Sequence, residues 1–199
     1  PSDPQWKNAP SSMFLEEAAR QITKRNGQLI NVDAMLIAEA PRIAPHIPAM
    51  KENIAAALSH AESQGLTIDY RATPVEELAE GGFDLVTSME VIEHVADPAT
   101  FVRALASKVS PDGLLILSTP NRTPLSRIAM ITVGESIGGI PKGTHDWGKF
   151  LTPEELTALL DAAGMDVIDS SGLSFDPARG FCLSANKAIN YLLTARPKN

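Results

Sequence analysis

The chain of 199 residues contains a single cysteine and few aromatic residues, which make up 5% of it. One cysteine cannot form an internal disulfide, and this is typical of a reducing compartment. Cys182 stands between Phe181 and Leu183, which favours a small buried apolar residue over a reactive thiol. No run of about 18 apolar residues occurs, so the sequence predicts no membrane-spanning helix.

Positive charge is in the minority. The chain has 17 Lys and Arg against 24 Asp and Glu, a net charge of -7 and a pI near 5.1. The basic residues are scattered, whereas nucleic-acid binding needs them clustered. We therefore expect no nucleic-acid partner. The chain opens at Pro1 without a starting Met and without a signal-peptide pattern. We expect a cytoplasmic protein from which an N-terminal part is missing.

Apolar segments with strand and helix periodicity alternate along the chain, which predicts an α/β fold with a parallel or mixed sheet. The predicted helices cover residues 11–26, 49–64, 124–134 and 152–164, with a further helix between the strands 83–87 and 114–119 and a helical turn over 74–78. The remaining predicted strands cover 29–38, 66–71, 165–170 and 189–195.

The segment from Phe83 to Pro98 carries the clearest functional signal. An apolar strand, 83–87, leads into a loop with the residues Met89, Glu90, Glu93 and His94. A helix, the turn Pro111-Asp-Gly113 and a second apolar strand follow, which together make a βαβ unit. Ligands of open α/β sheets bind at the carboxyl ends of the strands, so we expect a site at this loop.

The sequence of residues 51–199 resembles the class I S-adenosylmethionine-dependent methyltransferases, and most of all the ubiquinone-biosynthesis O-methyltransferases. The resemblance implies a Rossmann-like fold and S-adenosylmethionine as cofactor. It implies methyl transfer to a hydroxyl of a polyprenyl catechol, so that the partner is a small prenylated phenol.

The resemblance also implies roles for residues of the acidic loop. Met89 and Glu90 would bind the cofactor, with Met89 beside its adenine or methionine part. Glu90, Glu93 and His94 would bind Mg²⁺, and carboxylates do suit such a hard ion. The alternative for Glu90, Glu93 and His94 is a solvated acidic turn in which His94 orients the next helix. The alternative for Met89 is an ordinary apolar residue at the end of a strand.

One further segment resembles the same family. In Pro141 to Trp147 the resemblance implies a loop that closes over the acceptor, in which His145 orients the phenol and Trp147 stacks on a ring. The alternative is a polar loop with one anchoring Trp. His94 and His145 are the catalytic candidates. Arg122 is a candidate for an acceptor carboxylate or a lipid phosphate, although a surface arginine is the simpler interpretation.

The segment from Ile128 to Ile140 is apolar with little charge. It predicts either buried core, or a lid over a prenylated substrate, or a contact with a membrane surface. The last alternative extends the expected location to the periphery of the inner membrane.

The first fifty residues resemble a different enzyme, methylerythritol cyclodiphosphate synthase of isoprenoid biosynthesis, through Pro1–Lys7 and Ile30–Met50. In that family the segment that matches Ala38 to Ala44 lines a cytidine pocket. We therefore predict two parts, residues 1–50 and 51–199, joined near Lys51 to Ala56. The sequence leaves open whether residues 1–50 belong to the native gene.

The join removes the part of a methyltransferase that holds its cofactor. Class I enzymes use a glycine-rich turn after the first strand and an acid after the second. Here no Gly-x-Gly occurs, no glycine lies between Gly27 and Gly65, and Asp33 stands far from the expected place of the acid. We predict an incomplete Rossmann-like sheet with a foreign N-terminal helix and strand. The strand 29–38 would pair parallel with 66–71. Activity is in doubt, and the alternatives are an inactive chimera or a nucleotide-binding remnant of the synthase.

Overall fold

The fold is that of a computed structural model, which describes residues 29–33, 55, 59, 62–63, 65, 69–71, 73–129, 146–176 and 180–198. The helix predicted over 11–26 lies outside the described residues, as do His145 and nearly all of the segment from Ile128 to Ile140. Of the helix predicted over 49–64, four separate residues are described, and all four are helical.

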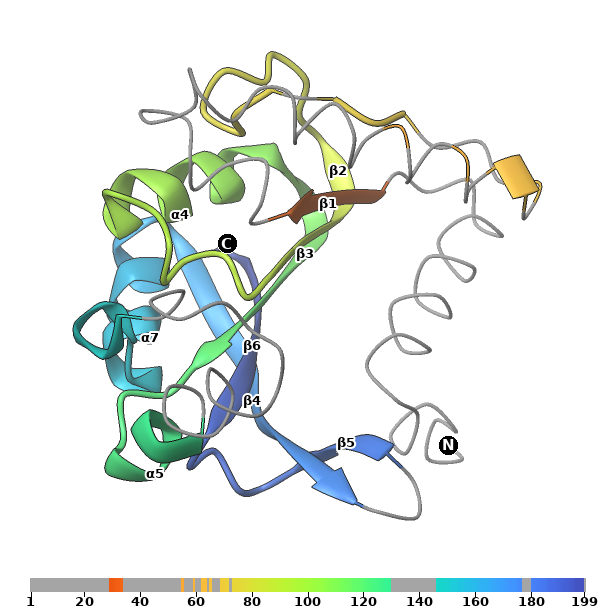
Figure 1. Cartoon of the computed structure of the whole chain (residues 1–199). Helices are drawn as coiled ribbons and strands as arrows, with labels where there is room; N and C mark the ends of the chain where they lie inside the picture. Colours follow the sequence, from red (N-terminus) through yellow and green to blue (C-terminus); the bar gives the residue numbers. More distant parts are fainter. Residues whose placement is uncertain are drawn as a thin grey trace, which may run out of the picture.

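The described residues form one mixed sheet of six strands in the order β1-β2-β3-β6-β4-β5 (Figure 1). β1, β2 and β3 run parallel, whereas β6 is antiparallel to both β3 and β4. The predicted mixed α/β sheet is therefore confirmed. The strands are β1 (Leu29–Asp33), β2 (Phe83–Met89), β3 (Val109–Pro120), β4 (Met165–Asp176), β5 (Gly180–Ser184) and β6 (Asn190–Pro197).

The first strand has a different partner from the predicted one. β1 pairs with β2, from Leu29 opposite Leu85 to Asp33 opposite Met89. Residues 69–71, the described part of the predicted partner, are not in a strand. Arg71 there is half exposed and pairs with Asp69 and Glu80. Such a solvated ion-pair cluster does not suit an inner strand, whereas β2 is buried from Leu85 to Ser88.

Two helices cover one face of the sheet, α4 (Pro98–Lys108) and α7 (Pro153–Ala162) (Figure 1). Each begins at a side-chain cap. The Asp97 carboxylate accepts hydrogen bonds from two backbone N–H groups of α4. Thr152 and Glu155 bond each other's backbone N–H groups, so the predicted helix start at Thr152 is confirmed as a capping box. The short helices α5 (Pro124–Ser126) and η3 (Trp147–Lys149) lie between β3 and α7 in sequence.

The core divides between the two faces of the sheet because neighbouring residues of a strand point to opposite sides. The larger cluster packs the sheet against α4 and α7, and the smaller one lies on the other face. The first includes Val86, Leu115, Leu117, Tyr191, Leu193, Phe101, Leu105, Leu156 and Leu160. The second is built on Leu85, Ile116 and Leu192.

The predicted turn Pro111-Asp-Gly113 is instead an irregularity within β3. Val109 pairs with Phe83 and Leu114 pairs with Leu85, so the residues between are extra on the β3 side. Gly113 is needed there because a Cβ atom would lie 2.8 Å from the Phe83 carbonyl oxygen and 2.9 Å from Val109 Cγ1. The strand thus keeps its pairing on both sides of the insertion.

We expect Gly113→Ala to destabilise the protein by about 1–3 kcal/mol, because the added methyl group meets backbone that cannot move away. Urea unfolding would measure the loss. Asp112→Ala, an exposed change in the same insertion, is the matched control and should leave the midpoint almost unchanged. Equal midpoints for the two variants would contradict this account of the insertion.

Candidate functional site

The end of β2 turns sharply at Glu90. Its φ is 56°, and it is the non-glycine residue with a left-handed backbone among the described residues. The backbone N–H of Glu90 donates to the Ser118 carbonyl oxygen at 3.0 Å. This turn brings the Glu90 side chain to the same face as Met89, which is half-buried against the smaller apolar cluster.

Two donors from distant strands hold the Glu90 carboxylate. The Ser118 hydroxyl donates to Oε1 at 2.6 Å, and Asn190 Nδ2 donates to Oε2 at 2.8 Å. Ser118 and Asn190 follow the alternation of Ile116 and Leu192, so both lie on the face away from α4 and α7. Both are also almost fully buried.

Glu93 lies on the opposite face. Its Oε2 accepts a hydrogen bond from the Thr119 hydroxyl at 2.8 Å, and Thr119 alternates with Leu117 toward the helices. The side chain is 1% exposed, and Oε1 has no hydrogen-bond partner, although His94 Nε2 is 3.8 Å away. Burial, and then the charge of Glu90, raise the pKa of the Glu93 carboxyl to about 8. Glu93 is thus largely uncharged at neutral pH.

The predicted convergence of Glu90, Glu93 and His94 on one ion is not found. Among the described residues, no group of three or more His, Cys, Asp or Glu side chains is placed to hold a metal. The physical reason is the left-handed turn at Glu90, which sends the two carboxylates to opposite faces of the sheet.

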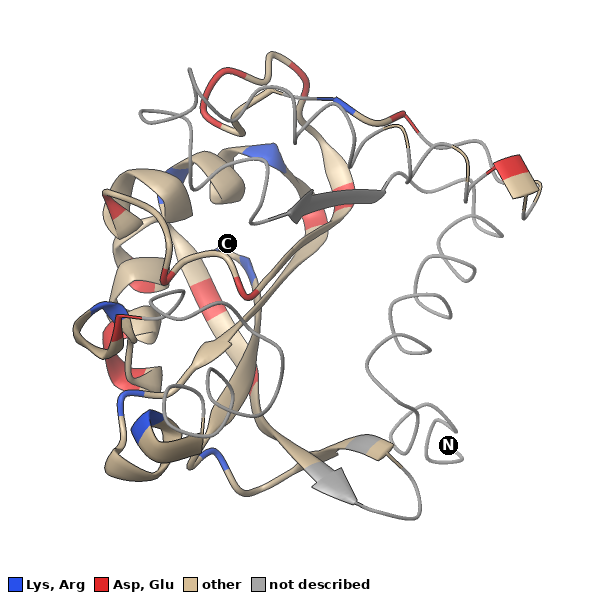
Figure 2. Cartoon of the chain, in the orientation of Figure 1, with Lys and Arg blue, Asp and Glu red and all other residues tan. Residues whose placement is uncertain are grey.

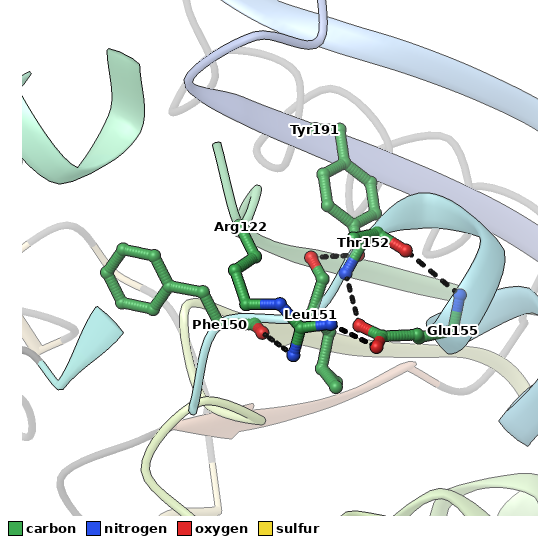
Figure 3. Close-up of polar contacts among 6 residues, drawn as sticks. All are labelled: Arg122, Phe150, Leu151, Thr152, Glu155 and Tyr191. Carbon is green, nitrogen blue, oxygen red and sulfur yellow. Dashed lines mark hydrogen bonds and ion pairs between the residues drawn. The ribbon is translucent and has the colours of Figure 1, made fainter. Parts of the chain in front are cut away.

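Arg122 follows β3 and joins it to the start of α7 (Figure 3). Its guanidinium pairs with the Glu155 carboxylate and donates to the Phe150 carbonyl oxygen at 3.3 Å. Tyr191 donates its hydroxyl proton to the Leu151 carbonyl oxygen at 3.1 Å, and burial raises the pKa of that hydroxyl. Arg122 is therefore half-buried and joins two elements, whereas the simpler interpretation was a surface arginine.

Trp147 is an anchor and not an exposed stacking surface. Its indole N–H donates to the Thr123 carbonyl oxygen at 3.0 Å, and the Arg127 guanidinium carbon lies 5.6 Å from the ring centroid. Its neighbour Asp146 caps η3 by accepting from the Gly148 N–H at 3.0 Å. Of the two alternatives for this loop, the contacts favour the anchoring Trp.

Sequence analysis missed Ser118, Thr119, Asn190 and Tyr191. Each stands within an apolar strand, and a single hydroxyl or amide there has no local pattern that distinguishes it from a surface residue. The signal that does exist is positional, since Ser118 and Thr119 end the second strand of a βαβ unit. Asn190 has no such signal, because its partner is 100 residues away.

Among the described residues, Lys and Arg are spread over several elements and do not gather on one of them (Figure 2). No helix among the described residues is long and apolar enough to cross a membrane. Ile128, where the apolar segment begins, is 56% exposed, and Leu125 beside it is 49% exposed.

Residues 1–91 match the YgbB family. This confirms the second resemblance, to methylerythritol cyclodiphosphate synthase, for the N-terminal part of the chain. The match extends to residue 91, beyond the predicted join near Lys51 to Ala56.

Residues of the chain also match ubiquinone biosynthesis O-methyltransferases, which confirms the first resemblance. The protein of that name from Cereibacter sphaeroides is 49% identical over 150 residues, which are 72% of this chain and 60% of the relative. The one from Azorhizobium caulinodans is 43% identical over 149 residues, 73% of this chain and 59% of the relative. The chain thus spans about 60% of the length of these relatives.

The fold is similar to solved methyltransferases. A S-adenosylmethionine-dependent methyltransferase from Thermotoga maritima, described as a possible histamine N-methyltransferase, superposes with a TM-score of 0.57 at 16% identity. The superposition covers 94% of this chain and 97% of the other. The Rossmann-like methyltransferase fold is therefore shown, with β1 as the strand beside β2.

We expect the stability of the protein to fall as the pH rises. The Glu93 pKa is about 8 in the folded state and ordinarily 4.5, so the stabilisation is complete below pH 4.5 and is lost as the pH rises through 8. The loss is on the order of 5 kcal/mol, since one pKa unit corresponds to about 1.4 kcal/mol. Glu93→Gln removes the titrating group and should flatten this part of the profile.

Urea unfolding between pH 5 and 9 would measure both profiles. Glu154→Gln, which removes the same charge from an exposed position, is the control and should keep the slope of the parent protein. A parent profile that is flat between pH 5 and 9 would show that Glu93 does not titrate in this range.

Proposed function

We propose that this chain carries the acceptor-side part of an O-methyltransferase of ubiquinone biosynthesis, which moves a methyl group from S-adenosylmethionine to a hydroxyl of a polyprenyl catechol. The observation that carries the proposal is the identity of 43–49% with proteins of that name over about three quarters of the chain. The loop after β2 lies at the carboxyl end of parallel strands, where open α/β sheets bind their ligands.

The described residues fit one part of the cofactor. When bound, S-adenosylmethionine supplies an electrophilic methyl group on a positively charged sulfur. Met89 offers an apolar surface, and Glu90 a carboxylate held by Ser118 and Asn190, so the pair suits a cation with an apolar body. Methyl transfer needs the phenol oxygen deprotonated and in line with the methyl group, and positioning supplies much of the rate. We assign the proton-accepting and orienting roles to His94 and His145.

The described residues do not offer the groups that would bind the remaining part of the cofactor. The strand beside β2 should continue into a glycine-rich turn whose N–H groups approach the cofactor. β1 ends at Asp33, and the next glycine in the sequence is Gly65. This absence and the match to the YgbB family favour the second candidate, a chain that is inactive as a methyltransferase or that keeps a nucleotide site from the synthase.

The acceptor and the location follow from the same proposal. A polyprenyl catechol is a membrane lipid precursor. The exposed Ile128 begins the apolar segment that would contact it or the membrane surface, and the exposed Leu125 precedes that segment. Peripheral membrane contact through Ile128 to Ile140 stays a prediction. Sedimentation with vesicles tests it, and a chain that remains in the supernatant would exclude it.

We expect the chain to bind S-adenosylhomocysteine at least about tenfold more weakly than the Cereibacter sphaeroides relative does. A tenfold loss is about 1.4 kcal/mol, and one charge-assisted hydrogen bond to the ribose is worth about 1.5–3 kcal/mol. Calorimetry on the two proteins measures the ratio. Equal affinities would mean that the segment around β1 rebuilds the cofactor pocket. Binding of a cytidine nucleotide instead would favour the synthase remnant.

We expect Mg²⁺ to bind no more tightly to the parent protein than to a Glu90→Ala variant, because Glu90 and Glu93 lie on opposite faces of the sheet. Titration with Mg²⁺, and with Mn²⁺ as a paramagnetic probe, would compare the two. Asp112→Ala serves as a control for the loss of one exposed carboxylate. A site of micromolar affinity that disappears with Glu90 would restore the metal hypothesis.

A further inference from the structure

The side of the sheet that ends at β4 and β5 has two halves with different outer strands. β5 pairs with β4 from Gly172 to Asp176, and among the described residues β4 is itself the outer strand from Met165 to Ser171 (Figure 1). The outer strand of a sheet presents backbone N–H and C=O groups that can pair with another chain, and proteins commonly block such edges.

The outer half of β4 is blocked in two ways. Its pairing with β6 shifts between Val167 and Asp169, which leaves Ile168 as an extra residue in a bulge. Ile168 is 49% exposed, and the exposed acids Asp166 and Asp169 stand on either side of it. Bulges and charged side chains both oppose the addition of another strand. This half of the edge is therefore unsuited to pairing.

β5 has neither a bulge nor a charge. Its five residues, Gly180–Ser184, include no charged residue and no proline. Its register with β4 runs without a shift, from Gly172 opposite Ser184 to Asp176 opposite Gly180. In the sheet of described residues β5 is the last strand, with β4 as its one neighbour. The outer edge of β5 is thus regular and uncharged.

Cys182, the single cysteine of the chain, stands at the centre of β5. Its side chain is half-buried, and not fully buried as the sequence suggests. A second copy of β5 that adds antiparallel with all five residues paired is related to the first by a two-fold axis at Cys182. Each Gly180 then lies opposite Ser184 of the other copy, and the two Cys182 residues lie opposite each other.

We propose that the outer edge of β5 is an interaction surface for a second copy of this chain, paired antiparallel about Cys182. Backbone hydrogen bonds then join the two sheets into one. A second copy suits this edge because an uncharged strand meets no like charge when it pairs with itself, and closed two-fold dimers are the commonest assemblies. Leu183, at the margin of the smaller apolar cluster, continues that cluster toward the other copy.

The proposed interface is small, because it consists of one pair of five-residue strands. Stable complexes bury at least about 1,000 Å². We therefore expect a weak dimer that dissociates on dilution. In sedimentation equilibrium the mass should rise from the 21.3 kDa of one chain toward twice that value as the protein concentration increases from about 10 µM to about 1 mM.

Charges at the centre of β5 test whether this edge forms the dimer. Cys182→Glu and Cys182→Lys each place two like charges opposite each other, and we expect each variant alone to dimerise at least about tenfold more weakly than the parent. An equimolar mixture of the two should recover the association, because unlike charges then face each other. Ile168→Glu, an exposed change on the blocked half of β4, is the control and should dimerise as the parent does.

Oxidation of the thiol tests the position of the two-fold axis. Directly opposite residues of an antiparallel pair have Cα atoms about 4.5–5.5 Å apart, within the range of a disulfide. We expect copper–phenanthroline in air to convert the parent into a covalent dimer that dithiothreitol separates. The control combines Cys182→Ser with Ser184→Cys, which moves the two thiols four residues, or about 13 Å, apart along the strands. It should not cross-link.

Three results would overturn the proposal. A mass that stays at 21.3 kDa up to about 1 mM would show that no dimer forms. A dimer that survives both charged variants, or a mixture that associates no better than either variant alone, would place the interface elsewhere. Equal cross-linking of the parent and the Ser184→Cys control would exclude an axis at Cys182. The cross-link needs no charged variant, so it decides the point even where a charge unfolds β5.

Discussion

The pairing of β3 with β2 on one side and β6 on the other is the interaction on which the rest of the structure depends. It brings the last two hydroxyls of β3 to the carboxyl end of the sheet, one on each face. Ser118 meets Glu90 there, and Thr119 meets Glu93. Two acids that are three residues apart in sequence are thereby drawn to different sides of the same sheet.

Glu90 and Glu93 consequently lie in different surroundings. Glu90 accepts hydrogen bonds on both oxygens at the edge where a ligand would bind, whereas Glu93 is buried beside apolar residues and favours its neutral form. The site is thus well built on the side formed by β2, β3 and β6. On the other side β1 occupies the right place in the sheet but lacks the glycines that would let a cofactor approach its backbone.

The sequence predicted the elements that depend on local pattern and missed those that depend on distant contacts. The strand at Phe83 and the helix start at Thr152 were predictable from apolar runs and a capping box. The partner of β1 was not, because a parallel pair is specified by burial and not by any residue of either strand. The separation of Glu90 from Glu93 was not predictable either, because spacing does not reveal a left-handed turn at a glutamate.

The position of β6 in the sheet determines when the described sheet can be completed during synthesis of the chain. β6 lies between β3 and β4, yet Asn190–Pro197 leaves the ribosome after both of them. Until then β3 presents an open, apolar edge, and such edges invite pairing with other chains. Translation that stalls before Asn190 would therefore release a nascent chain prone to aggregate, and a chaperone would be needed most in that interval.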